Sequence, residues 1–326
     1  MPRTVKRLPF LLLLAAVPNL ARADEAKVVE LVQSHKGKIT RDDKAEGKPI
    51  VKVDVSASEV TADELKHLAE LKSLHSLNVG GTRIGDEGLK QIATLTTLRT
   101  LRMGGTQMGV TAEGFKELAK LTELETLGVD NMNVRNAWLK DLTGLKKLKA
   151  IYLERALVGD EGAKTLRDIP SLETVLIQKT SLGDAGLKAL GELPNLKYLD
   201  ASVTKVTDAG VEGLTGAKKL EALDLYDTKV SDAGAEHLAK IETLTYLNLD
   251  YTQLTDAGLK RLKRLPKLRR LHLGNTNVTD AGIPELYGMT TLQTLSIMSS
   301  DATPKAIAAL QEKLPDCRIY HREGRP

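Results

Sequence analysis

The chain has few of the residues that build a large irregular core or a disulfide framework. Only 3% of its 326 residues are aromatic. Cys317 is its single cysteine, so no disulfide can form within the chain. Leucine dominates the apolar residues, and this composition favours many small, similar layers over one large core.

No apolar run is long enough to span a membrane as a helix, which needs about 20 residues. The most apolar stretch, Leu8 to Val17, is short and is interrupted by a proline. It follows a basic start at residues 3–7 and precedes the small-residue site Ala21-Arg22-Ala23. This order predicts a secretory signal peptide over residues 1–23, and therefore a secreted or periplasmic protein with no membrane span.

An excess of charge of one sign is also missing. The formal net charge of +4 comes from residues 1–23, which hold four basic residues and no acidic one. The remaining chain is formally neutral, which gives no support for a nucleic-acid partner.

The sequence does contain a pattern that recurs every 24 residues. The segment Leu220-Glu-Ala-Leu223-Asp-Leu225, with its following Thr, Asp and Gly, returns 24 and 48 residues later. A fixed period of this size predicts a solenoid of stacked units. About eleven units are found, and every spacing between their starts is 24 residues except one of 26. The units start at Ile50, Leu74, Leu98, Leu124, Leu148, Leu172, Leu196, Leu220, Leu244, Leu268 and Leu292.

Each unit is predicted to hold one strand and one helix. Leu223-Asp-Leu225 alternates with period two, as in a strand whose leucines face the core, and the spacing becomes helical from Asp232. The open ends of such a stack need caps. The predicted divisions are a signal peptide (1–23), an N-terminal cap (24–49), the repeat array (50–300) and a C-terminal cap (301–326).

The motif LxxLxLxxT followed by (V)(T/S)DAGL resembles leucine-rich repeats of the cysteine-containing type, with Thr in place of the usual Cys or Asn. Similar arrays occur in F-box-type ubiquitin-ligase subunits and in secreted bacterial proteins, notably of planctomycetes. No F-box segment is recognised before residue 50, so the chain looks like the secreted bacterial group. The resemblance implies a curved α/β leucine-rich-repeat solenoid, with a parallel β-sheet on the concave face and α-helices on the convex face.

Two polar columns recur in phase with the repeat and are predicted to be structural. The aspartates begin the helices, where a carboxylate can satisfy free N–H groups, and the threonine hydroxyls are expected to bond backbone groups after the strands. No metal-ligand spacing, nucleophile motif or phosphate loop is present, so neither catalysis nor a cofactor is predicted. The columns are Asp160, Asp184, Asp208, Asp232, Asp256 and Asp280, and Thr180, Thr204, Thr228, Thr252 and Thr276.

The candidate binding residues are those that do not repeat. Residues beside the strand leucines should face the concave surface, where neighbouring strands lie about 4.8 Å apart. Tyrosine and carboxylate side chains at these places suit recognition of a protein or peptide, or of a glycan. The predicted site comprises Tyr152, Tyr198, Asp200, Asp224, Tyr226, Asp227, Tyr246, Asn248, Asp250 and Tyr251.

Two other irregular features leave alternatives open. A basic run between Lys260 and Arg270 is either a solvated outer face or a contact for an anionic polymer. Trp138 stands where most units have glycine, and it either fills a gap in the core or belongs to a local contact loop.

These observations predict a non-catalytic, extracytoplasmic binding module that recognises its partner on the concave sheet. The alternatives are an envelope or matrix scaffold that contacts anionic polymer through its basic convex helix, and a substrate adaptor like the F-box proteins. The oligomeric state stays open.

Overall fold

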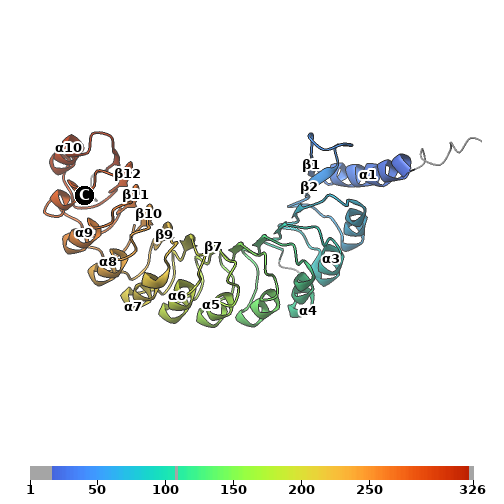
Figure 1. Ribbon diagram of the computed structural model, residues 1–326, viewed down its shortest axis with the longest axis horizontal. Coiled ribbons are helices and arrows are strands. Elements are labelled where there is room, and N and C mark those ends of the chain that lie inside the picture. The colour runs from blue at the N-terminus through green and yellow to red at the C-terminus, as the bar shows by residue number, and fades with distance from the viewer. Residues whose placement is uncertain (1–16, 107–108, 323–326) are drawn as a thin grey trace, which may run out of the picture.

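The computed structural model describes residues 17–106 and 109–322. They form a curved solenoid in which one continuous sheet lines the concave side and the helices lie on the convex side (Figure 1). The α/β leucine-rich solenoid predicted from the repeat is therefore confirmed.

The described part of the sheet has 13 strands, which follow one another in chain order. The strands are β1 (Lys38–Arg41), β2 (Ile50–Asp54), β3 (Ser76–Asn78), β4 (Thr100–Arg102), β5 (Thr126–Gly128), β6 (Ala150–Tyr152), β7 (Thr174–Leu176), β8 (Tyr198–Asp200), β9 (Ala222–Asp224), β10 (Tyr246–Asn248), β11 (Arg270–His272), β12 (Thr294–Ser296) and β13 (Arg318–Tyr320).

From β2 onward all pairs are parallel, and paired residues lie one unit apart, as in Leu223 beside Leu247. The first pair differs, because β1 runs antiparallel to β2. Strand β1 lies in the predicted N-terminal cap (24–49), outside the repeat array for which the parallel sheet was predicted.

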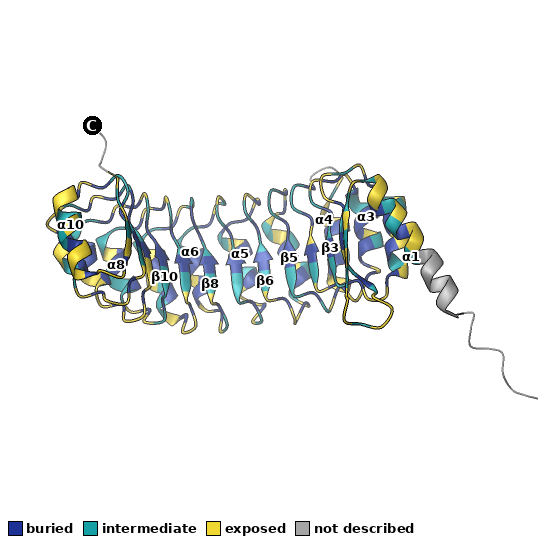
Figure 2. Ribbon diagram, turned by 90° about the horizontal axis from the view of Figure 1, so that it is seen from above, coloured by how far each residue is buried: buried dark blue, intermediate teal, exposed yellow. Residues whose placement is uncertain are grey.

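Apart from α1, which has 18 residues and lies at the N-terminal end of the solenoid, the helices are short and lie side by side on the convex side (Figures 1 and 2). They are α1 (Val17–Ser34), α2 (Ala62–Leu65), α3 (Gly85–Ile92), α4 (Ala112–Phe115), α5 (Asp160–Leu166), α6 (Asp184–Gly191), α7 (Asp208–Gly213), α8 (Asp232–Leu238), α9 (Asp256–Leu262) and α10 (Pro304–Lys313). The 3₁₀ helices are η1 (Lys66–Glu70), η2 (Lys116–Lys120), η3 (Asn136–Leu142), η4 (Leu214–Gly216) and η5 (Ile283–Leu286).

Residues 1–16 of the predicted signal peptide lie outside the described residues. Helix α1 begins at Val17 and continues past the predicted cleavage position at Ala23 to Ser34. Among the described helices, none combines the length and apolar character that a membrane crossing requires. The signal peptide and the domain boundaries therefore stay predictions.

The core is a row of aliphatic side chains between the sheet and the helices. Leu223 and Leu225 from β9 and the loop after it are fully buried, as are Leu247 and Leu249 one unit later. Full burial of each leucine contributes about 1.5–3 kcal/mol, so the energy of the fold is spread evenly along the array.

The threonine column closes the bend after each strand, as predicted. The hydroxyl of each residue donates to the carbonyl oxygen three residues earlier, at 2.6–2.7 Å. Because these hydroxyls are bonded locally, the column is not available as a ligand surface.

The aspartate column connects one unit to the next. Asp184 accepts hydrogen bonds from the backbone N–H and the hydroxyl of Thr207, both at 2.7 Å, and Thr207 caps α7 in the next unit. Asp208 and Ser231 repeat the arrangement. The structural role is as predicted, but the bonded N–H groups belong to the following unit.

The same contact explains the glycine two residues after each of these aspartates. A Cβ on Gly210 would lie 2.5 Å from the Asp184 carboxylate, and one on Gly234 would lie 2.5 Å from Asp208. The carboxylate of one unit therefore occupies the space beside the helix of the next, and only glycine leaves enough room.

Trp138 stands at this glycine position, in a unit whose preceding unit lacks the aspartate. The preceding unit has Ala112 in place of the aspartate, so no carboxylate occupies the space. The Trp138 ring packs partly buried against Phe115, with ring centroids 5.4 Å apart. Of the two interpretations, this contact favours the one in which Trp138 covers the core.

Candidate binding surface on the concave sheet

The parallel register brings most of the predicted site residues together on β8, β9 and β10. Tyr198 lies beside Ala222, which lies beside Tyr246. Two residues further along each strand, Asp200, Asp224 and Asn248 form a second row. The predicted proximity of these side chains follows directly from the one-unit register.

Tyr152 is not part of this group. It lies on β6, and Leu176 of β7 separates it from Asp200 in the same row. The guanidinium of Arg102 lies 4.9 Å from the centroid of its ring. The prediction of one continuous patch with five tyrosines was therefore wrong for Tyr152.

Tyr246 lies on β10, at the edge of the group next to β11, and its side chain contacts other groups of the protein. Its hydroxyl donates to an Asp224 carboxylate oxygen at 3.2 Å, and its ring meets that of His272 with centroids 5.5 Å apart. The Arg270 guanidinium lies 5.2 Å from the ring centroid. Burial of the hydroxyl, followed by the negative charge of Asp224, raises the pKa of Tyr246 far above its usual value.

The second row closes the ends of the strands. Asp224 accepts from the N–H of Tyr226 at 2.9 Å and from the amide of Asn248 at 3.0 Å, while Asn248 accepts from the N–H of Asp250 at 3.0 Å. Asn248 is only 8% exposed. Because both ends of its side chain bond protein groups, Asn248 positions the surface and is not free to hold a ligand, contrary to its prediction as a binding residue.

Asp200 also accepts hydrogen bonds at the end of its strand, but from fewer residues than Asp224 does. It accepts from the N–H and the hydroxyl of Ser202, at 3.0 and 2.7 Å. Burial, with a further contribution from the neighbouring Asp224 and Glu154 charges, nevertheless raises the pKa of the Asp200 carboxyl. The concave face around β8 and β9 is therefore a region of net negative potential.

Tyr226 and Tyr251 lie in the turns after β9 and β10, where Tyr226 is partly buried and Tyr251 is exposed. Their ring centroids lie 5.1 Å apart at an interplanar angle of 60°, and Tyr251 is 46% exposed. Partial burial, followed by the negative groups around it, raises the pKa of Tyr226. The two rings are thus in contact across neighbouring units, and their role in binding stays a prediction.

Asp227 and Tyr251 hold their positions through left-handed backbone, with φ of 51° and 59°. Every repeat bends in this way at the corresponding residue, so the conformation is part of the array. Asp227 is exposed, and Asp250 bonds the N–H of Gly274 while lying 3.8 Å from His272.

Sequence reasoning missed Arg270 and His272 as members of the concave surface. Both flank the strand leucine of β11, so the rule that selected Tyr246 and Asn248 also points to them. Arg270 had instead been counted with the basic run.

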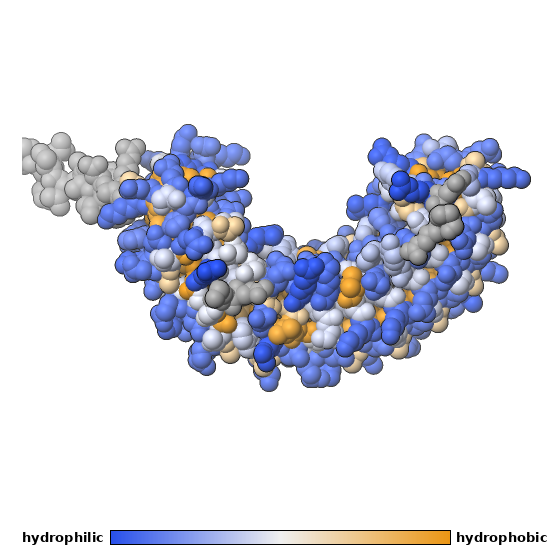
Figure 3. Space-filling model, turned by 180° about the vertical axis from the view of Figure 1, so that it is seen from behind, coloured by the Kyte–Doolittle hydropathy of each residue, from blue (hydrophilic) through white to orange (hydrophobic). Residues whose placement is uncertain are grey.

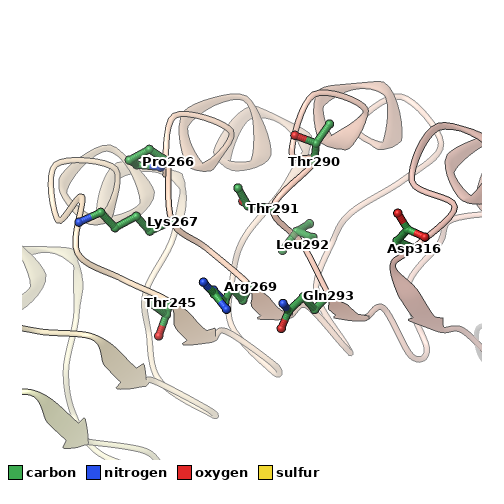
Figure 4. Close-up of a pocket in the computed structure, with 9 residues that line it drawn as sticks. All are labelled: Thr245, Pro266, Lys267, Arg269, Thr290, Thr291, Leu292, Gln293 and Asp316. Atoms are coloured by element: carbon green, nitrogen blue, oxygen red, sulfur yellow. The ribbon is translucent and has the colours of Figure 1, made fainter.

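The structure divides that basic run among three surfaces. Arg261 on α9 pairs with Glu236 at 3.2 Å, and Arg270 lies on the concave face. Lys267 and Arg269 line a groove of about 480 Å³ at the edge where the chain enters the strands (Figure 4). Lys260 and Arg261 lie in the last turn of α9 and Lys263 caps its end, so the predicted basic convex helix holds part of the run.

The grooves between units do not coincide with the tyrosine site. The one in Figure 4 is lined mainly by threonine, proline and basic side chains from the loops before β10 to β12, with Asp316 beside them. Viewed from behind, the surface is largely hydrophilic, with apolar residues in small separate groups (Figure 3). This face shows no large apolar area for docking.

Comparison with known proteins identifies the architecture. The family described as Leucine Rich repeat matches residues 70–93, 240–263 and 264–285. No curated protein matches the sequence.

An internalin (inlF) from Listeria monocytogenes is similar in structure, with 18% identity, a TM-score of 0.58, and coverage of 94% of this chain and 95% of that one. The leucine-rich repeat protein LIC12759 from Leptospira interrogans shares 20% identity with a TM-score of 0.53, over 78% of this chain and 74% of its own. At such identities the likeness establishes the fold alone. The chain therefore has the fold of a curved α/β leucine-rich-repeat solenoid, and three of its segments match the repeat family.

Proposed function

We propose that this protein is a non-catalytic binding module that recognises a protein or peptide partner on its concave sheet. The observation that carries the proposal is the contact between the exposed Tyr251 and the partly buried Tyr226, in the turns that follow β10 and β9 and close in sequence to Asp227 and Asp250. Tyrosine contributes apolar contact area and a polar tip at low entropic cost, which suits an interface.

The charges favour a peptide over a neutral glycan. Within residues 17–106 and 109–322, no lysine or arginine forms an ion pair with Asp200, Asp224 or Asp227. Asp200 and Asp224 accept hydrogen bonds from neutral donors, which do not cancel their charge, and Asp227 is exposed. A positively charged segment would complete the surface electrostatically.

The predicted signal peptide over residues 1–23 supports action outside the cytoplasm, in a secreted or periplasmic protein. A scaffold role through a basic convex helix has less support, because the basic run is divided among the helix, the groove and the concave face.

Replacement of Tyr226 and Tyr251 by alanine tests the proposal. Immobilised wild-type protein should retain a partner from an envelope extract, identified by mass spectrometry, and the double variant should lose it. Tyr320→Ala is the matched control, because Tyr320 is also 46% exposed but lies on the end strand β13. Equal retention by all three folded proteins would refute the proposed surface.

A further inference from the structure

We propose that Tyr226, Tyr251 and Asp227 form a receiving site for an arginine side chain of the partner. The inference rests on the proposed function and names the chemistry that the same surface recognises. It starts from how the protein's own arginines contact tyrosines on this face.

Two concave tyrosines already have a guanidinium over their rings. Arg102 lies 4.9 Å from the Tyr152 centroid, and Arg270 lies 5.2 Å from the Tyr246 centroid. These distances are within the range of about 6 Å in which a cation is attracted by the electrons of an aromatic ring. The fold thus repeatedly places arginine against tyrosine on this sheet.

The Tyr226–Tyr251 pair has the rings but no such cation among the described residues. Its rings are tilted at 60°, and both Tyr251 and the neighbouring Asp227 are exposed. The residue that follows Tyr226 is Asp227, and the one that precedes Tyr251 is Asp250. Aromatic faces and a nearby carboxylate therefore occur together without the positive group found at Tyr152 and Tyr246.

The electrostatic environment selects a cation. Partial burial, followed by the charges of Tyr251, Asp227, Asp250 and Asp224, raises the pKa of Tyr226. On the neighbouring strand, Arg270 is engaged against Tyr246, and the His272 ring lies 3.8 Å from Asp250. A positive group from the partner would face both aromatic and carboxylate contacts.

Arginine fits this arrangement better than lysine. Its planar guanidinium can stack on a ring while its N–H groups donate to a carboxylate. The ammonium of lysine is more strongly hydrated and lacks a plane for stacking. We therefore expect an arginine-containing segment in extended conformation to be the preferred ligand.

Three blocked peptides test the inference, with the sequence Gly-Ser-X-Ser-Gly and X as arginine, lysine or citrulline, the neutral isostere of arginine. Binding is measured by NMR titration of protein labelled in its tyrosine rings. The arginine peptide should bind at least about fivefold more tightly than the citrulline peptide, and its signals should shift the Tyr226 and Tyr251 resonances. Added salt should weaken the arginine complex.

Asp227→Asn and Tyr251→Leu should each reduce the preference for arginine over citrulline, whereas Tyr320→Leu should leave it unchanged. Equal affinity for arginine and citrulline, or no shift at millimolar peptide, overturns the inference. Equal affinity for lysine and arginine overturns the stacking geometry. Loss of the natural partner in Tyr226→Ala/Tyr251→Ala without any arginine preference would leave the proposed function intact and reject this inference alone.

Discussion

Asp200 shows how one position can serve the fold and also carry unfavourable charge. Its carboxylate accepts a hydrogen bond from Ser202 at the end of β8. The equivalent position is Asp224 in the next unit and Asn248 in the unit after that. Asparagine supplies the same acceptor oxygen without charge. The negative charge at residue 200 is therefore not required by the backbone.

We predict that Asp200→Asn stabilises the protein at pH 7 by about 0.5–1 kcal/mol, typical of relieved surface repulsion. Because the folded-state pKa of Asp200 is raised, the wild type loses stability as pH rises from below the unfolded pKa to above the folded one. The advantage of the variant should therefore disappear at pH 3. Urea unfolding at both pH values measures this difference.

The reverse substitution, Asn248→Asp, serves as the control for this prediction. It adds a carboxylate beside Asp224 and removes an amide donor, so it should destabilise the protein at pH 7. A lower stability of Asp200→Asn at pH 7 would contradict the prediction, because it would mean that the folded protein stabilises the negative charge of Asp200.

Val203 has the least suitable side chain for its backbone conformation. Its φ is 53°, in the left-handed region that β-branched residues strongly disfavour. Asn131 and Asn275 occupy the same place in other units. We predict that Val203→Asn raises the free energy of unfolding by about 0.5–1 kcal/mol, visible as a higher melting temperature. Asn275→Val should lower it, and a lower melting temperature for Val203→Asn would contradict the prediction.

At the scale of the helices, the contact between Asp184 and Gly210 joins neighbouring units. Glycine to alanine within a helix normally stabilises by about 0.5–1 kcal/mol. Here the added Cβ would lie 2.5 Å from the Asp184 carboxylate and 3.0 Å from its Cα. We predict that Gly210→Ala destabilises the protein by about 1–3 kcal/mol, as expected for overpacking.

A double-mutant cycle with Asp184→Ala identifies the cause of that loss. Asp184→Ala alone removes two hydrogen bonds to Thr207 and should destabilise α7. The double variant should lose less stability than the sum of the two single variants, because the carboxylate that meets the new methyl group is gone. Strict additivity in urea unfolding would exclude this contact as the cause. Ala112 followed by Trp138 is a natural example of the relaxed pair.

At the scale of the whole molecule, each unit contacts its sequence neighbours, so the array should tolerate loss of a complete unit. We predict that deletion of residues 150–173 leaves a folded, shorter solenoid with a lower melting temperature. Ala150 pairs with Thr174 in the sheet, so the deletion preserves the phase of the repeat. Circular dichroism and small-angle X-ray scattering would measure helical content, melting and length.

A half-unit deletion, residues 150–161, is the control and should destroy cooperative unfolding because it places helical residues in register with a strand. The complete-unit deletion also brings Lys149 next to Lys197, since it removes the Glu173 that pairs with Lys197 at 2.7 Å. Added salt should therefore stabilise this variant more than the wild type. If the variant that lacks residues 150–173 were unfolded, contacts between adjacent units alone would not account for the stability of the array.

The sequence by itself determined the solenoid, the phase of its units, and the structural nature of the threonine and aspartate columns. It could do so because each depends on local periodicity, burial and capping, which every unit repeats. The tertiary structure decided which members of the concave rows are accessible. It separates Tyr152 from the other tyrosines, buries Asn248 and places Arg270 against Tyr246. Those outcomes depend on contacts between side chains of neighbouring units. The sequence pattern of a single unit does not give the distances between such side chains.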